Sequence, residues 1–167
     1  VVLNAMDAKT NNASIFTYTK IVKVENDCKY WNVIANFKKN NVIKTLKFSS
    51  KVIVNAAGPW TDELISKINP SSSKPKKTKL IKGSHIIVPK IYNHKNAYIF
   101  QHKDGRIIFT IPYEKKFSLI GTTEINFNGD PSKAKISEDE IKYLCDAVST
   151  YFTNKIKPKD IIWTYSG

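Results

Sequence analysis

The tetrapeptide Lys82-Gly83-Ser84-His85 interrupts an otherwise apolar run and contains the residue types that proton transfer needs. A histidine can accept a proton near neutral pH, as a general base must. A glycine inside a strand indicates a bulge or the close approach of a ligand. Two interpretations of His85 therefore stay open, a catalytic base or a structural histidine whose ring is satisfied within the fold.

A second candidate is the turn Asn55-Ala56-Ala57-Gly58-Pro59-Trp60, which joins an apolar run to an amphipathic segment. Small residues there would let a ligand approach the backbone closely, and the start of a helix favours an anionic group. A tight turn that needs small residues for packing explains the same pattern. The turn lacks the glycine-rich fingerprint, so by itself it does not predict a dinucleotide-binding site.

Weaker signals come from hydroxyls, one arginine, cysteines and histidines. Turn chemistry accounts for Gly121-Thr122-Thr123-Glu124, and Arg106 suits either an anion contact or a salt bridge at a hairpin edge. Cys28 and Cys145 form no CxxC pair, and the three histidines have no metal-binding spacing. We therefore expect two reduced, partly buried thiols and no metal site.

The elements expected to position these residues fall into two groups. In the first group, residues 1–9 suit a helix, and three alternating runs predict an antiparallel meander. Residues 51–58 suit a parallel strand buried on both faces, and 59–68 suit an amphipathic helix. The meander runs are 15–24, 31–37 and 42–48.

The second group follows a loop of proline, serine and lysine at 69–78, which we take as a linker. Asp104-Gly105 predicts a hairpin turn, and Ser137 to Glu140 forms a capping box that opens a helix. The predicted strands are 79–89, 97–102, 106–112, 117–123 and 161–165. The chain is thus an α+β protein with one unit at 1–68 and another at 79–167.

Composition limits the function classes. With 167 residues and 41% hydrophobic residues the chain can form one domain or two small lobes, and no run of eighteen apolar residues suggests a membrane span. The net charge of +13 comes almost wholly from lysine, whereas nucleic-acid binders rely on arginine. We expect no nucleic-acid partner. An anionic membrane surface stays open through the lysine cluster Lys74, Lys76, Lys77 and Lys79.

Several stretches together resemble the FAD-dependent glycerol-3-phosphate dehydrogenases. They are the start of the chain (Val1 to Ala8), the turn at 54–60, Leu80-Ile81-Lys82-Gly83-Ser84-His85-Ile86-Ile87-Val88-Pro89, the strand 107–113, Phe117 to Glu124 with its IGTTE ending, and Ile161 to Gly167 with its WTYSG ending. The NAAGPW stretch is shared among many flavoprotein oxidases. The ordered combination is specific, and it spans essentially the whole chain.

The resemblance implies a flavoprotein with an FAD-binding domain and a β-rich antiparallel cap that holds the substrate. Residues 1–68 would be the second half of the FAD domain and 79–167 most of the cap. The reaction would oxidise glycerol 3-phosphate to dihydroxyacetone phosphate, with a hydride passing to FAD and electrons to a membrane quinone. The protein would be peripheral on a bacterial inner membrane or on the mitochondrial inner membrane.

The resemblance also assigns roles to residues. His85 matches the active-site histidine, as the base or a hydrogen-bond partner of the C2 hydroxyl. The substrate contacts would be Lys82, Ser84, Thr122 and Tyr165. The cofactor contacts would be Ala56, Ala57, Gly58, Trp60 and Gly83.

Both ends of the chain suggest an internal piece of a longer protein, and the family's glycine-rich pyrophosphate motif is not in this sequence. We therefore expect FAD in the full-length protein and poor binding of cofactor and substrate by these 167 residues alone. Two alternatives stay open. One is an oxidase that passes electrons to oxygen, and the other is a non-catalytic basic module that binds anionic lipid or nucleic acid.

Overall fold

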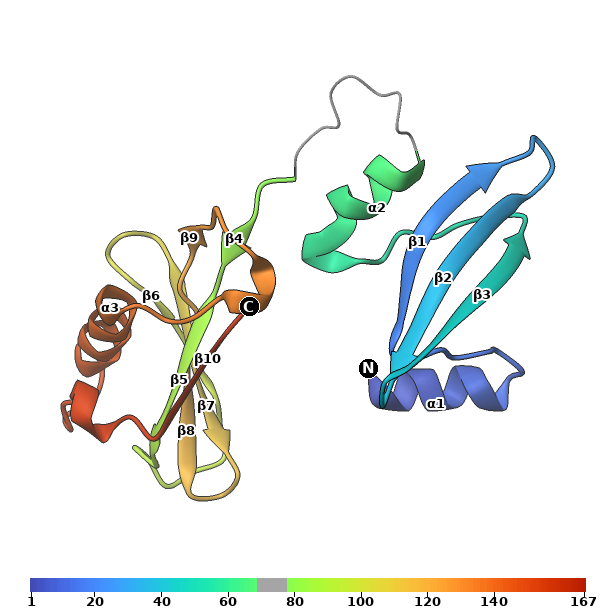
Figure 1. Cartoon of the computed structure of the whole chain (residues 1–167). Coiled ribbons are helices and arrows are strands. Elements are labelled where there is room, and N and C mark those ends of the chain that lie inside the picture. The colour runs from blue at the N-terminus through green and yellow to red at the C-terminus, as the bar shows by residue number, and fades with distance from the viewer. Residues whose placement is uncertain (69–77) are drawn as a thin grey trace. The chain divides into compact units, whose positions relative to one another are not determined.

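The computed structural model describes residues 1–68 and 78–167, which form two compact units, Val1–Thr78 and Lys79–Gly167 (Figure 1). Apart from Thr78, the predicted linker 69–78 lies outside the described residues, as do Lys74, Lys76 and Lys77. The assignment of the two units to an FAD domain and a cap stays a prediction. The mixed helix and strand content confirms the α+β class.

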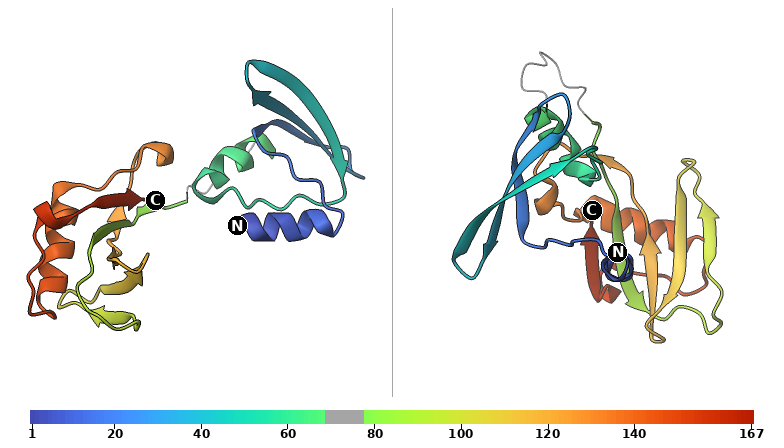
Figure 2. Two further views of the ribbon diagram at one scale, coloured as in Figure 1. Left: turned by 90° about the horizontal axis from the view of Figure 1, so that it is seen from below. Right: turned by 90° about the vertical axis from the view of Figure 1, so that its right-hand side faces the viewer.

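The first unit is built around the predicted meander. After helix α1 (Val2–Thr10), strands β1 (Thr19–Asn26), β2 (Trp31–Lys39) and β3 (Val42–Ser50) pair antiparallel in the order β1-β2-β3. Asn40 and Asn41 both have positive φ, 47° and 60°, as a two-residue hairpin turn with the right twist requires. Figure 2 shows these long, twisted strands from two further directions.

The predicted buried strand at 51–58 is wrong. The segment runs to the turn without pairing to any strand among the described residues, and Val52 and Val54 are 70% and 82% exposed. A strand needs neighbours for its backbone hydrogen bonds, and none of the described strands offers them here. The helix prediction is confirmed, because a 3₁₀ turn (Gly58–Trp60) leads directly into α2 (Thr61–Ile68).

The second unit is a five-stranded antiparallel sheet with one helix against it (Figure 1). The order is β10-β5-β8-β7-β6, and β4 and β9 form a separate two-stranded sheet. The bounds are β4 (Ile81–Lys82), β5 (Ser84–Pro89), β6 (Tyr98–Gln101), β7 (Ile107–Tyr113), β8 (Phe117–Gly121), β9 (Ile125–Asn126) and β10 (Trp163–Ser166). The predicted strands are therefore confirmed, with 79–89 divided at Gly83.

Helix α3 (Glu138–Ser149) covers one face of this sheet. Its Leu144 and Val148 are fully buried against Ile86 and Ile120, because the apolar positions recur at helical spacing. The predicted capping box is confirmed, since Ser137 accepts from the Glu140 amide and the Glu140 carboxylate accepts from the Ser137 amide. None of the helices within 1–68 and 78–167 is long and apolar enough to cross a membrane.

Candidate functional site

His85 lies on the face of the second unit's sheet that α3 does not cover. Successive residues of a strand point to opposite faces, so the buried Ile86 and Val88 point toward α3 and His85 points away. Residues directly opposite one another on neighbouring strands share a face. The face that we call the His85 face therefore has two rows, Tyr165–His85–Gly121–Phe109–Ile99 and Trp163–Ile87–Leu119–Ile111.

The His85 ring is held between its two neighbours in the sheet. On the β10 side it stacks on Tyr165, with ring centroids 4.8 Å apart and an angle of 5° between the planes. On the β8 side it lies against Gly121, where a Cβ atom would overlap the ring. Glycine at this position therefore leaves the space that the imidazole occupies.

The environment of His85 favours its neutral form. Burial lowers the pKa of the imidazole below its ordinary value, because a charged ring would lose hydration. A neutral imidazole at physiological pH has a ring nitrogen that can accept a proton. Most of the surrounding face is apolar, yet Trp163 and Tyr165 remain 68% and 46% exposed. The arrangement can therefore present a proton acceptor to a ligand that lies on this face.

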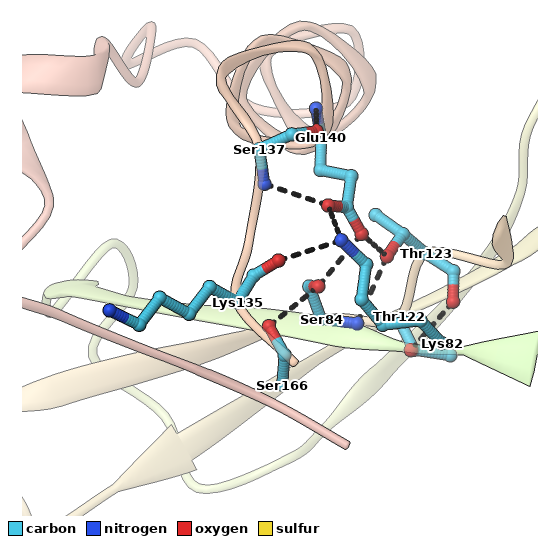
Figure 3. Close-up of polar contacts among 8 residues, drawn as sticks. All are labelled: Lys82, Ser84, Thr122, Thr123, Lys135, Ser137, Glu140 and Ser166. Carbon is cyan, nitrogen blue, oxygen red and sulfur yellow. Dashed lines mark hydrogen bonds and ion pairs between the residues drawn. The ribbon is translucent and has the colours of Figure 1, made fainter. Parts of the chain in front are cut away.

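Lys82 and Ser84 lie on the opposite side of the strand from His85, in a buried polar network (Figure 3). The Lys82 Nζ atom lies 2.7 Å from Glu140 Oε2 and donates to the Lys135 carbonyl oxygen at 2.7 Å. The Ser84 hydroxyl donates to Glu140 Oε1 at 2.7 Å. Both predicted substrate contacts thus have their polar atoms committed to internal partners.

Glu140 is the centre of this network although only 2% of it is exposed. Its Oε1 atom also accepts from the Thr123 hydroxyl at 2.7 Å, and its Oε2 atom from the Ser137 amide at 2.7 Å. Burial raises the pKa of this carboxyl, but the hydrogen bonds from Lys82, Thr123, Ser137 and Ser84 outweigh it and lower the pKa to about 2. Glu140 is therefore ionised and paired.

The remaining predicted residues of this unit lie close to His85 or Lys82. Tyr165 is the stacking partner described above, and the Thr122 hydroxyl is only 2.5 Å from where a Cβ of Gly83 would stand. The backbones of Gly83 and Gly167 form two hydrogen bonds. The Gly83 amide donates to the Gly167 carbonyl at 2.8 Å, and the Gly83 carbonyl accepts from the Gly167 amide at 3.0 Å. Their contacts with substrate or cofactor stay predictions.

The predicted turn of the first unit presents open backbone. The Asn55 side chain fixes it, donating to the Thr61 carbonyl at 3.1 Å and accepting from the Ala57 amide at 3.2 Å. Gly58 has a φ of +54° and nothing within 4 Å of where a Cβ would stand. Ala57 and Trp60 line a hollow of about 390 Å³, which Thr19, Lys20, Ile21, Glu63, Leu64 and Lys67 complete.

Two further candidates have structural explanations. Arg106 pairs with Asp104 through Nε at 2.8 Å and through its terminal nitrogen at 2.5 Å, and its guanidinium stacks 3.8 Å from the Tyr143 ring centre. The hairpin salt bridge is therefore the correct reading. Cys145 is a buried free thiol, as predicted, whereas Cys28 is exposed.

Sequence reasoning missed two residues that the geometry singles out, Glu140 and Gly121. Glu140 was assigned only to the capping box, yet a buried lysine at Lys82 is a signal that a carboxylate must lie nearby. Gly121 was read as part of a hydroxyl-rich turn. Its contact with His85 depends on the strand register, which the sequence alone does not fix.

Comparison with known proteins gives one family and several named relatives. The model of the family described as "FAD dependent oxidoreductase" matches residues 1–167. The chain is 39% identical to a D-erythritol 1-phosphate dehydrogenase of Brucella abortus and 36% identical to an aerobic glycerol-3-phosphate dehydrogenase of Escherichia coli, in both cases over all of its length. It covers 33% of each relative, so it spans about a third of their length.

A solved structure also matches this chain. The glycerol-3-phosphate dehydrogenase of Bacillus halodurans, determined with FAD, superposes with a TM-score of 0.82 at 28% identity. The match covers 96% of this chain and 32% of that one. The predicted antiparallel strands and mixed fold are therefore those of a known FAD-containing protein.

Proposed function

The chain belongs to the FAD dependent oxidoreductase family, and on that premise we propose that it is part of a flavoenzyme that oxidises glycerol 3-phosphate to dihydroxyacetone phosphate. The support is the resemblance of its ordered motifs and the names of relatives at 36% and 37% identity. Because the chain spans about a third of those relatives, the activity is proposed for the whole protein.

The residues of the first unit fit contact with a flat cofactor. The turn at Ala56, Ala57 and Gly58 is formed by small residues, and the space beside Gly58 is open. The exposed indole of Trp60 offers an aromatic surface next to it. We propose that these residues contribute part of the FAD site, and the cofactor contact of Gly83 stays a separate prediction. When bound, FAD would accept the hydride that leaves C2 of the substrate.

The observation that carries the proposal is the position of the His85 imidazole, which stacks on Tyr165 and lies against Gly121 on an open, mainly apolar face. Oxidation of a secondary alcohol to a ketone removes a hydride from carbon and a proton from oxygen. We propose that a His85 ring nitrogen takes the proton of the C2 hydroxyl. Stacking on Tyr165 and contact with Gly121 would keep the ring in one orientation while it does so.

The proposed substrate contacts differ in what they would require. Tyr165 and Thr122 are partly exposed beside His85 and Gly83, so a ligand can reach them without rearrangement. Lys82 and Ser84 would first have to release Glu140. We therefore propose that Tyr165 and Thr122 contact the substrate directly. Contacts from Lys82 and Ser84 stay predictions, because they require these residues to break their bonds to Glu140 first.

A longer polyol phosphate is a second candidate substrate, because the chain is 39% identical to a D-erythritol 1-phosphate dehydrogenase. We further propose a membrane quinone as the electron acceptor and a peripheral location on a bacterial or mitochondrial inner membrane. Family membership leaves a non-catalytic basic module without support. The following experiment distinguishes a quinone from oxygen as the electron acceptor.

The experiment uses the intact parent protein, purified with its flavin and kept free of oxygen. We expect glycerol 3-phosphate to bleach the flavin and to yield dihydroxyacetone phosphate. If erythritol 1-phosphate bleaches the flavin faster, the second substrate is correct. Rapid reoxidation by a quinone analogue, with little hydrogen peroxide in air, supports the dehydrogenase. A flavin that neither substrate reduces would refute the proposed function.

A further inference from the structure

We propose that Glu140 is a positioning residue for His85, acting through three hydroxyl groups that fix the strands around the imidazole ring. This inference rests on the proposed function, because it gives Glu140 a role in the same site. Glu140 itself lies on the α3 side of the sheet and cannot touch a ligand on the His85 face. Its effect must therefore pass through the backbone of its partners.

Three backbone segments adjoin the His85 ring, and each carries a hydroxyl of the Glu140 network. Figure 3 shows these hydroxyls, which belong to Ser84, Thr123 and Ser166. Ser84 directly precedes His85 in β5, and Ser166 directly follows Tyr165 in β10. Thr123 stands two residues after Gly121, the last residue of β8. The histidine, its stacking partner and the glycine beneath the ring are thus each next, or nearly next, to a hydroxyl of the network.

The hydrogen bonds connect these segments to one carboxylate oxygen. Ser84 and Thr123 both donate to Glu140 Oε1 at 2.7 Å, and Thr123 also accepts from the Ser84 amide at 2.9 Å. Because Ser84 uses its single proton on Glu140, Ser166 is the donor in the 2.8 Å contact between the two serine hydroxyls. The strands that hold the ring therefore share one anchor.

Helix capping does not require this arrangement. The capping box uses Glu140 Oε2, which accepts from the Ser137 amide, and the other oxygen would ordinarily face solvent at the start of a helix. Here Oε1 is buried, and Lys82 supplies the charge that keeps the carboxylate ionised. A fully satisfied buried network fixes its members in one geometry, which is what positioning requires.

The test is a double-mutant cycle in the intact, flavin-loaded parent protein. Glu140→Gln keeps the size of the side chain but removes the charge, and we expect it to slow flavin reduction by glycerol 3-phosphate about tenfold to a hundredfold, because small misplacements of a reacting group have such effects. In a His85→Ala background, Glu140→Gln should add almost no further loss, since it acts through the ring. Equal losses in both backgrounds would overturn the proposal.

The matched control is Glu138→Gln, which removes the same charge from an exposed position in the same helical turn and should leave the rate within about twofold. If Glu140→Gln does not fold, Thr123→Val provides the same cycle, because it deletes one hydroxyl of the network and keeps the shape of the side chain. An additive result for Thr123→Val would equally overturn the proposal.

A crystal structure of the folded variant separates this proposal from the proposed function. We expect the His85 and Tyr165 rings to leave their parallel arrangement at 4.8 Å in Glu140→Gln, whichever substrate the enzyme uses. Unmoved rings would refute the positioning role even if glycerol 3-phosphate reduces the flavin. Displaced rings in an enzyme that glycerol 3-phosphate does not reduce would keep the positioning role and refute the function.

Discussion

A methyl group added at Gly121 is expected to displace the His85 ring and to slow flavin reduction about a hundredfold. The Cβ of Gly121→Ala would stand 2.6 Å from the Cγ atom and 2.7 Å from the Nε2 atom of the imidazole. Ordinary contacts between such atoms are about 3.5–4.0 Å, so the ring must retreat by about 1 Å. A misplacement of that size costs about 10²-fold in rate, or about 3 kcal/mol of activation free energy.

The same change should also lower stability. The atom that must move belongs to a side chain on the open face, and overpacking of this kind costs about 1–3 kcal/mol. Flavin reduction is measured by rapid mixing of the oxygen-free parent protein with glycerol 3-phosphate, and stability by urea unfolding. In a His85→Ala background, Gly121→Ala should change the rate little. A Gly121→Ala enzyme that reduces its flavin at the unmodified rate would refute the reasoning.

Three further predictions concern the same unit. Tyr165→Phe should keep the stacked ring and the reduction rate within a few-fold, whereas Tyr165→Ala should slow rapid-mixing reduction about tenfold, since an aromatic pair contributes about 0.5–1.5 kcal/mol; equal rates would contradict the stacking role. Lys82→Met should lower the free energy of unfolding in urea by about 3–5 kcal/mol because it leaves a buried carboxylate unpaired, and adding Glu140→Gln should restore much of it. The rate of reduction should fall on acidification with a midpoint below the ordinary histidine value of 6.5, because burial lowers the pKa of His85 and the neutral ring is the active form; a midpoint above that value would show that another group controls the rate.

Local patterns predicted most of the elements. The meander, the Asp104-Gly105 hairpin and the Ser137 capping box all depend on neighbours within a few residues, and all three are present. The prediction of a buried strand at 51–58 failed because such a strand depends on partner strands elsewhere. An apolar run does not show whether the chain contains those partners.

The candidate site could be predicted only in part from the sequence, because some of its contacts also depend on residues far away in the chain. His85 stood out because a titratable residue interrupts an apolar strand. Lys82 and Ser84 do not share the open face with His85, because side chains alternate along a strand and these two lie on the opposite face. Their partner Glu140 is more than fifty residues away, and such a contact depends on how α3 packs on the sheet.

We propose that His85 accepts the substrate proton during flavin reduction. The direct measurement follows the flavin absorbance of the oxygen-free parent protein in a single turnover with glycerol 3-phosphate, beside its His85→Ala variant at equal flavin content. We expect the flavin to bleach in both proteins, but about 10²-fold to 10⁴-fold more slowly in the variant, because the variant lacks the general base. Equal rates in the two proteins would contradict the claim and leave His85 as a structural residue.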